Sequence, residues 1–89
     1  MKTTKIYRSD DYTNNNGNLI GFFTSKEEAE SEIEFSNPIK IWDGTFSQIT
    51  EFEVDSNKLE GVDISDNEAM LSEEIWGSGE ITNTFYYKN

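Results

Sequence analysis

The sequence predicts an α+β domain in which a small, mostly antiparallel sheet of about five strands packs against two helices. Three observations lead to this fold class. Short apolar runs alternate with polar residues, as in half-buried strands. Tight-turn dipeptides separate pairs of these runs, and two capping-box patterns open stretches with helical periodicity. The predicted element order is β-β-α-β-β-α-β, within a single domain that spans residues 1–89.

A hairpin is predicted at the start of the chain. Residues 5–8 alternate as a first strand, and residues 19–23 form the second. The polar stretch 10–18 between them reads as a loop, with its tight turn at Asn16-Gly17, because both residues accept a positive φ.

The first helix is predicted to begin at Thr24 or Ser25, since Ser25-x-x-Glu28 and Thr24-x-x-Glu27 fit a capping box equally well. Ala29 and Ile33 share one narrow face of this helix, and glutamates occupy the rest of its surface. The helix is predicted to end before Asn37-Pro38, because proline cannot extend the hydrogen-bond ladder.

A second hairpin is predicted from the alternating strand 39–42, a turn at Asp43-Gly44 and a return strand over residues 45–54. Ile49 is out of phase with Phe52 in the return strand, which indicates a bulge or a late start. The second helix is predicted over residues 65–76, and the final strand over residues 81–87.

Twelve aromatic residues supply most of the predicted core. Six are expected to be buried: Tyr7, Phe22, Trp42, Phe52, Trp76 and Phe85. Four others have an unclear phase and are candidates for an interface: Phe23, Phe35, Tyr86 and Tyr87. Only one member of the neighbouring pair Tyr86 and Tyr87 can face inward on a strand.

The composition argues against an enzyme and against a cofactor or metal site. The chain has no Cys and no His, so the commonest nucleophile–base pairs and zinc ligands are missing. An EF-hand loop aligned on Gly17 lacks both end ligands, and one that starts at Asp63 lacks the required central glycine. Paired carboxylates for hydrolysis remain the one open chemistry, and eighteen acids produce close pairs by chance.

The net charge of -11 argues against direct binding to nucleic acid or to anionic membranes. The sequence shows no targeting segment and no apolar run of membrane-spanning length, so we expect a cytoplasmic location. Sixteen acids and two bases lie between Glu27 and Glu80, whereas the first eight residues carry three bases and no acid. Such a surface suits a partner with a basic groove.

The carboxylates expected to contact this partner form two rows. On a strand, residues two apart project about 6.6 Å apart on one face, close to the spacing of successive phosphates. The helical row uses the i, i+3 and i, i+4 spacing. The six predicted contact residues are Glu27, Glu28, Glu30, Glu34, Glu51 and Glu53.

A short, very acidic α+β chain without Cys or His resembles phage-encoded inhibitors of nucleic-acid-binding host proteins, such as anti-CRISPR proteins, anti-restriction proteins and uracil-DNA glycosylase inhibitors. This resemblance implies a non-enzymatic inhibitor that binds a host defence nuclease or a similar protein. Three alternatives stay open: an immunity protein against a nuclease toxin, a housekeeping interaction module, and a protein that sequesters a small ligand. Pairing between exposed edges of the first or last strand would give a homodimer.

Overall fold

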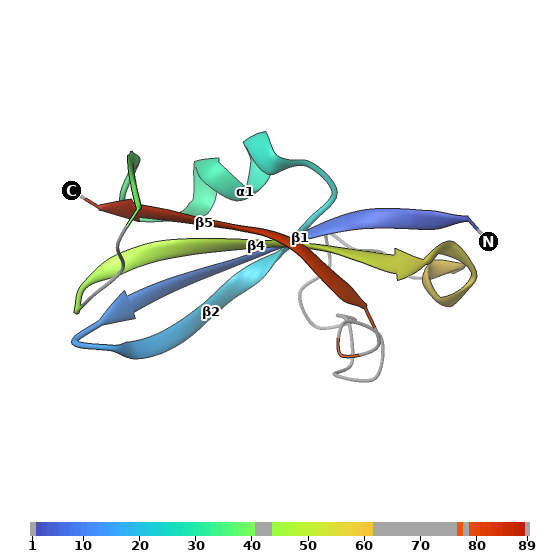
Figure 1. The fold of residues 1–89 in the computed structure, drawn as a ribbon, viewed down its shortest axis with the longest axis horizontal. Helices are drawn as coiled ribbons and strands as arrows, with labels where there is room; N and C mark the ends of the chain where they lie inside the picture. Colours follow the sequence, from blue (N-terminus) through green and yellow to red (C-terminus); the bar gives the residue numbers. More distant parts are fainter. Residues whose placement is uncertain (1, 41–43, 62–76, 78, 89) are drawn as a thin grey trace.

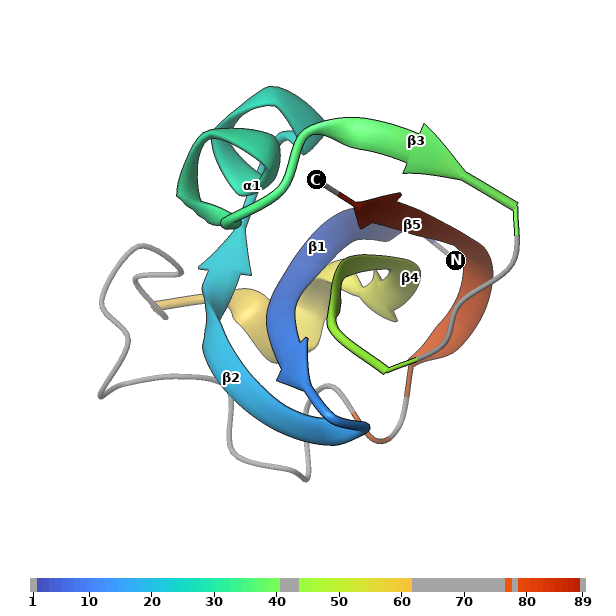
Figure 2. The ribbon, with the colours of Figure 1, turned by 90° about the vertical axis from the view of Figure 1, so that its left-hand side faces the viewer.

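The computed structural model describes residues 2–40, 44–61, 77 and 79–88. These residues form one curled, five-stranded sheet with the strand order β2-β1-β4-β5-β3, and every neighbouring pair is antiparallel (Figures 1 and 2). The strands are β1 (Thr3–Thr13), β2 (Asn16–Phe23), β3 (Asn37–Ile39), β4 (Phe46–Asp55) and β5 (Glu80–Lys88). One α-helix, α1 (Lys26–Glu32), and a 3₁₀ turn, η1 (Ser56–Leu59), complete the described elements.

The expected α+β class with two helices is wrong, because the described chain is mostly β. Its single α-helix has seven residues, whereas β1 and β4 alone have eleven and ten. β1 is longer than the local apolar run suggested, since Asp10, which was predicted to lie in a loop, is buried in the sheet. The predicted second helix, with Trp76, lies outside the described residues, as does Trp42.

The β1–β2 hairpin turns earlier than predicted. Asn14 and Asn15 form the turn with φ values of 50° and 67°, and the Asn16-Gly17 dipeptide belongs to β2. Contacts far along the chain select this turn: the backbone N–H of Asn15 donates to the carbonyl of Gly44 at 2.8 Å, and the Asn15 side chain accepts from the Gly44 N–H at 2.9 Å. The stretch 10–18, predicted to be a loop, is therefore mostly strand.

The predicted start of α1 is confirmed. Ser25 is the N-cap, its hydroxyl accepts the Glu28 N–H at 3.2 Å, and the Glu28 carboxylate accepts from the Ser25 hydroxyl at 3.3 Å. The Ser25–Glu28 N–H bond is the first half of the expected capping box, whereas the Glu28 carboxylate bonds the Ser25 hydroxyl rather than its backbone N–H. Ala29, fully buried, docks the helix on the sheet, and the Ser9 hydroxyl donates to the Ala29 carbonyl at 3.1 Å.

The helix ends well before the predicted stop at Asn37-Pro38. Its C-cap, Ile33, has an extended backbone. The next two N–H groups donate to sheet side chains instead of helix carbonyls: that of Glu34 to Asp11 and that of Phe35 to Ser47, each at 3.1 Å. This extended segment lets both Ile33 and Phe35 pack against the core under α1.

The second hairpin does not form as predicted. Residues 37–39 make the short β3, which pairs with β5 rather than with β4. The return strand is confirmed as β4 and the final strand as β5, each within one residue of its predicted bounds. The free edges of the sheet are consequently β2 and β3, whereas the first and last strands, whose edges were expected to be exposed, lie inside it.

The two faces of the sheet are both covered over much of their area. The helix face, under α1, carries a core of Ala29, Ile49 and Tyr87, with Tyr7, Phe23 and Phe85 packed around it. The opposite face carries the fully buried Ile6, Phe22, Phe46, Phe52 and Val54. Because β4 is buried on both faces, Ile49 needs no bulge within the β1–β4 ladder to reach a core. Phe22 and Phe52 are confirmed as core residues, and Tyr87, a candidate interface residue, is buried.

Candidate functional site

Four of the carboxylates on and just beyond α1 are exposed and form what we call the acidic ridge: Glu27, Glu28, Glu32 and Glu34. α1 lies on one side of the sheet, and the ridge therefore projects from the helix face of the molecule (Figure 1). Three of these residues were predicted contacts, and Glu32 is an addition. Glu34 is not on the helix, because α1 has already ended.

Glu30, also a predicted contact, is directed toward the core instead. Its Oε2 accepts a hydrogen bond from the Tyr87 hydroxyl at 3.0 Å, and its side chain is partly buried. Burial, followed by this hydrogen bond and the charge of Glu30, raises the pKa of Tyr87. Glu30 thus ties α1 to β5 and contributes less to the exposed surface than its neighbours.

Glu51 and Glu53 share one face of β4, as predicted, and this is the helix face, but they do not make an exposed row. Glu51 is buried: Thr82 Oγ1 donates to its Oε1 at 2.9 Å, and Lys5 Nζ lies 3.7 Å from the same oxygen. Burial tends to raise the pKa of Glu51, but hydrogen bonds from Tyr7 and Thr82 and the charge of Lys5 outweigh it, so the pKa is lowered. Glu51 is a structural carboxylate, and only Glu53 remains partly exposed.

Among the described residues, no ridge carboxylate takes part in an ion pair. The two ion pairs formed there are Lys5–Glu51 and Arg8–Asp10, and neither includes a ridge carboxylate. Lys26, at the start of α1, is held over the Phe85 ring with Nζ 4.0 Å from its centroid. Glu27 and Glu28 suit the positive N-terminus of the helix, whereas Glu32 lies at its negative end.

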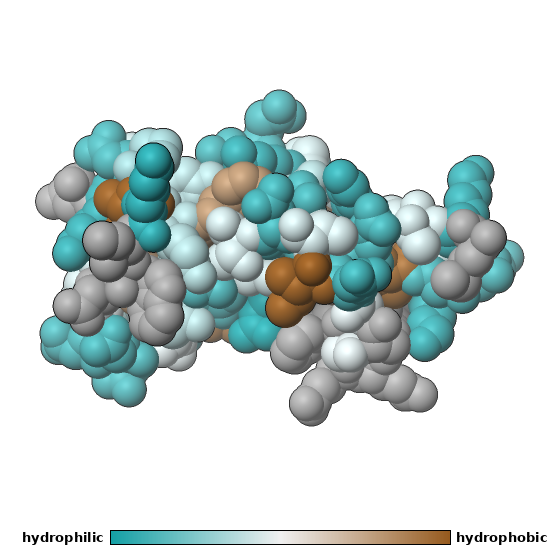
Figure 3. Space-filling model, in the orientation of Figure 1, coloured by the Kyte–Doolittle hydropathy of each residue, from teal (hydrophilic) through white to brown (hydrophobic). Residues whose placement is uncertain are grey.

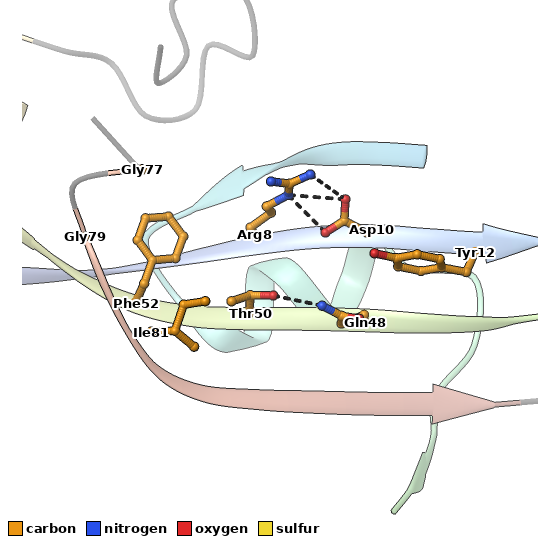
Figure 4. Close-up of a pocket in the computed structure, with 9 residues that line it drawn as sticks. All are labelled: Arg8, Asp10, Tyr12, Gln48, Thr50, Phe52, Gly77, Gly79 and Ile81. Carbon is orange, nitrogen blue, oxygen red and sulfur yellow. Dashed lines mark hydrogen bonds and ion pairs between the residues drawn. The ribbon is translucent and has the colours of Figure 1, made fainter. Parts of the chain in front are cut away.

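A second feature lies on the opposite face of the sheet, where sequence reasoning placed no site. Side chains of β1 and β4 surround a hollow of about 260 Å³, which we call the polar hollow (Figure 4). Its polar wall comprises Arg8, Asp10, Tyr12, Gln48 and Thr50. The other end is lined by Phe52 and by Ile81, which is 66% exposed. Elsewhere hydrophobic atoms reach the surface only in small separate areas of the view in Figure 3.

A buried ion pair stands in the wall of this hollow. Arg8 Nε donates to Asp10 Oδ2 at 3.1 Å, and Arg8 Nη2 donates to Asp10 Oδ1 at 3.2 Å. The guanidinium therefore binds both carboxylate oxygens. The Asp10 side chain is 5% exposed and that of Arg8 26%. Burial raises the pKa of Asp10 despite the opposing charge and hydrogen bonds of Arg8. A register shift in the β1–β2 ladder lies directly beside the pair, between Ser9 and Asp10.

A sequence signal for this site exists in retrospect. Arg8, Asp10 and Tyr12 alternate along one strand, as do Gln48, Thr50 and Phe52 on its neighbour, so each set shares a face. The interpretation of residues 10–18 as a loop hid this pattern.

Among the described residues, no group of His, Cys, Asp and Glu side chains could hold a metal ion. No helix among them has the length and apolar composition needed to cross a membrane.

Comparison of the chain with protein-family models, with curated proteins and with solved structures found no match. The acidic ridge and the polar hollow are therefore the two features of the molecule that bear on its function.

Proposed function

We propose that the protein is a non-enzymatic inhibitor whose acidic ridge binds the basic nucleic-acid site of a host nuclease or of another nucleic-acid-binding protein. The observation that carries this proposal is the unpaired charge of the ridge. Four exposed carboxylates fall within eight consecutive residues, and neither of the ion pairs among the described residues includes one of them. The phage-encoded inhibitors that the chain resembles act on partners of this kind, in the cytoplasm of the host cell.

The ridge is electrostatically unfavourable for the isolated protein. Glu28 and Glu32 are four residues apart on α1, where like charges repel, and Glu32 also faces the negative end of the helix dipole. Each effect costs a few tenths of a kcal/mol at an exposed site. A basic groove would relieve this repulsion on binding, and the field of a chain with net charge -11 would accelerate the encounter.

The ridge is also held in a fixed position. Ala29 is fully buried on the sheet side of the helix, and the Ser9 hydroxyl donates a hydrogen bond to its carbonyl. The hydroxyl of Tyr87, on β5, donates to the Glu30 carboxylate. The Ser25 cap fixes the first turn. A partner would therefore meet a preformed row of carboxylates, and little conformational entropy would be lost on binding.

A pull-down tests the partner class. The immobilised protein is incubated with bacterial lysate at about 50 mM and about 500 mM salt, which changes the screening of exposed charges strongly. We expect a nucleic-acid-binding protein to be retained at low salt and to be released by added duplex DNA, because both ligands would occupy one site. Retention that duplex DNA does not affect would contradict a shared site.

Two matched double variants separate the effect of the ridge carboxylates on binding from the effect of the net charge. Glu27→Lys with Glu32→Lys reverses the ridge, and Glu60→Lys with Glu80→Lys makes the same charge change at exposed positions elsewhere. We expect the ridge variant to bind the retained partner more than about ten-fold more weakly and the control about two-fold more weakly. Equal weakening would leave only non-specific charge attraction. Circular dichroism of both variants checks that the fold is intact.

A further inference from the structure

The polar hollow has two properties that sheet stability alone does not explain. It contains a charge pair whose carboxylate is almost fully buried, and replacing such pairs with packed apolar residues is often neutral or stabilising. It lies beside an irregularity in the β1–β2 ladder, where Ile20 is the extra residue between the partners of Ser9 and Asp10. Bulges of this kind are common next to binding sites because they redirect neighbouring side chains.

The walls of the polar hollow are held in place before any ligand arrives. The Tyr12 ring stacks on Phe46 with centroids 4.6 Å apart and planes 5° from parallel. Its other side lies so close to Gly17 that a Cβ there would be 2.8 Å from the ring. On β4, the Gln48 amide donates to Thr50 Oγ1 at 3.1 Å. Side chains fixed in this way lose little entropy when they bind a molecule.

The chemistry of the walls limits the ligand. Arg8 and Asp10 carry opposite charges 3.1 Å apart, and the other described lining residues are uncharged, so the described part of the lining offers a charged molecule no net attraction. The phenol of Tyr12, the amide of Gln48 and the hydroxyl of Thr50 can each donate and accept hydrogen bonds. Ile81, which is 66% exposed, adds an apolar surface at one end, next to the buried Phe52 (Figure 4). A volume of about 260 Å³ lies just below the range of sites for drug-sized ligands.

We propose that the polar hollow binds a small uncharged ring molecule that carries adjacent hydrogen-bond donors and acceptors, the chemistry shared by nucleobases and monosaccharides. The ring packs against the exposed Ile81 side chain, and its polar edge faces Gln48 and Thr50. This site is on the opposite side of the sheet from the acidic ridge, so it goes beyond the proposed inhibitor function and does not depend on it.

An NMR titration of the full chain tests the site. The ¹⁵N-labelled protein is titrated to about 10 mM with uridine, adenosine, glucose and N-acetylglucosamine in separate arms, and with guanidinium and inorganic phosphate as charged probes. We expect one uncharged arm to shift the amide signals of residues 10, 12, 48 and 50 while those of α1 stay in place. Shifts with a nucleoside alone would identify a nucleobase as the ligand, and shifts with a sugar alone would identify a monosaccharide. Binding of a charged probe alone, or no shift in any arm, overturns the proposal.

A matched pair of variants ties the shifts to the hollow. Thr50→Val removes one hydroxyl without changing the side-chain shape, and Thr13→Val makes the same change at the exposed end of β1. Loss of one neutral hydrogen bond predicts about three- to ten-fold weaker binding for Thr50→Val and unchanged binding for Thr13→Val. Equal affinity of the Thr50→Val variant and the unaltered protein would place the ligand elsewhere and refute the assignment.

Discussion

Tyr87→Phe is the most informative single substitution in the core, because it removes one oxygen atom and leaves the packing of the ring unchanged. The Tyr87 hydroxyl donates to Glu30 Oε2 at 3.0 Å, and Tyr87 is only 3% exposed. A hydrogen bond to a charged group is worth about 1.5–3 kcal/mol. Water can reach the partly exposed Glu30 once the hydroxyl is gone, so we expect the low end, about 1.5 kcal/mol.

This loss corresponds to a clear thermal shift. Unfolding entropies of about 2.1 cal/mol/K per residue give about 0.19 kcal/mol/K for a chain of this length, and hence a decrease in Tm of about 8 °C. The decrease should be measured at pH 7 by differential scanning calorimetry. A double-mutant cycle with Glu30→Gln should recover most of the loss as coupling energy between the two residues. The cycle of Glu30→Gln with Tyr86→Phe, which changes a phenol on the opposite face, should be additive.

The pH dependence provides an independent check. Burial and the Glu30 contact raise the pKa of Tyr87 above its ordinary value of 10.0, so the unfolded chain loses this proton first as the pH rises. The stability that Tyr87 contributes is therefore complete below pH 10 and is lost above it. The Phe variant has no such group. The difference between the two proteins should shrink by about 1.4 kcal/mol between pH 9 and pH 11.

A difference that stays constant to pH 11 would refute this reasoning, because it would mean that the folded state does not protect the Tyr87 proton. A Tyr87→Phe variant as stable as the unaltered protein at pH 7 would show that the Glu30 contact adds nothing to stability.

Three further predictions concern the helix and the buried carboxylate. Ser9→Ala leaves the Ala29 carbonyl near the C-terminus of α1 without its donor, and should cost about 1–2 kcal/mol in urea denaturation; a loss below a few tenths would mean that water replaces the hydroxyl. Ser25→Ala removes the N-cap and should cost about 1 kcal/mol, with Ser25→Gly milder; the reverse order would count against capping. Glu51→Gln should destabilise the protein at pH 7 but less at pH 3, because the lowered pKa of Glu51 gives stability above its ordinary value of 4.5 that is lost as the pH falls; equal loss at both pH values would show that the charge is irrelevant.

Features set by neighbouring residues could be predicted from the sequence. The N-cap at Ser25 and the docking position of Ala29 follow from helix geometry alone, and both were confirmed. Strand β5 was also predicted well, because its Thr, Phe and Tyr residues favour an extended backbone whatever they pack against.

Features set by distant residues could not be predicted in this way. Asn16-Gly17 is the stronger local turn signal, but Asn15 is held by Gly44, twenty-nine residues along the chain, and this contact moves the turn. Pro38 is the stronger helix terminator, but the Glu34 and Phe35 N–H groups find acceptors on the sheet and end α1 earlier.

The same limit applies to the candidate sites. Exposure of the glutamates on α1 follows from their position around the helix, so most of the acidic ridge could be predicted. The burial of Glu51 depends on Lys5 from one neighbouring strand and Thr82 from the other, which no local pattern reveals. The polar hollow depends on the register of β1 against β4, in which Arg8 lies opposite Thr50 and Asp10 opposite Gln48.

The position of β5 determines when the chain can fold during its synthesis. β5 pairs with β4 on one side and, within the described part of the chain, supplies the only sheet neighbour of β3 on the other. A nascent chain that stops short of residue 80 therefore has β3 unattached, an open edge on β4 and no Tyr87 to complete the cluster beneath α1. We expect a chain truncated before residue 80 to be sensitive to protease, and the chain that includes β5 to be resistant.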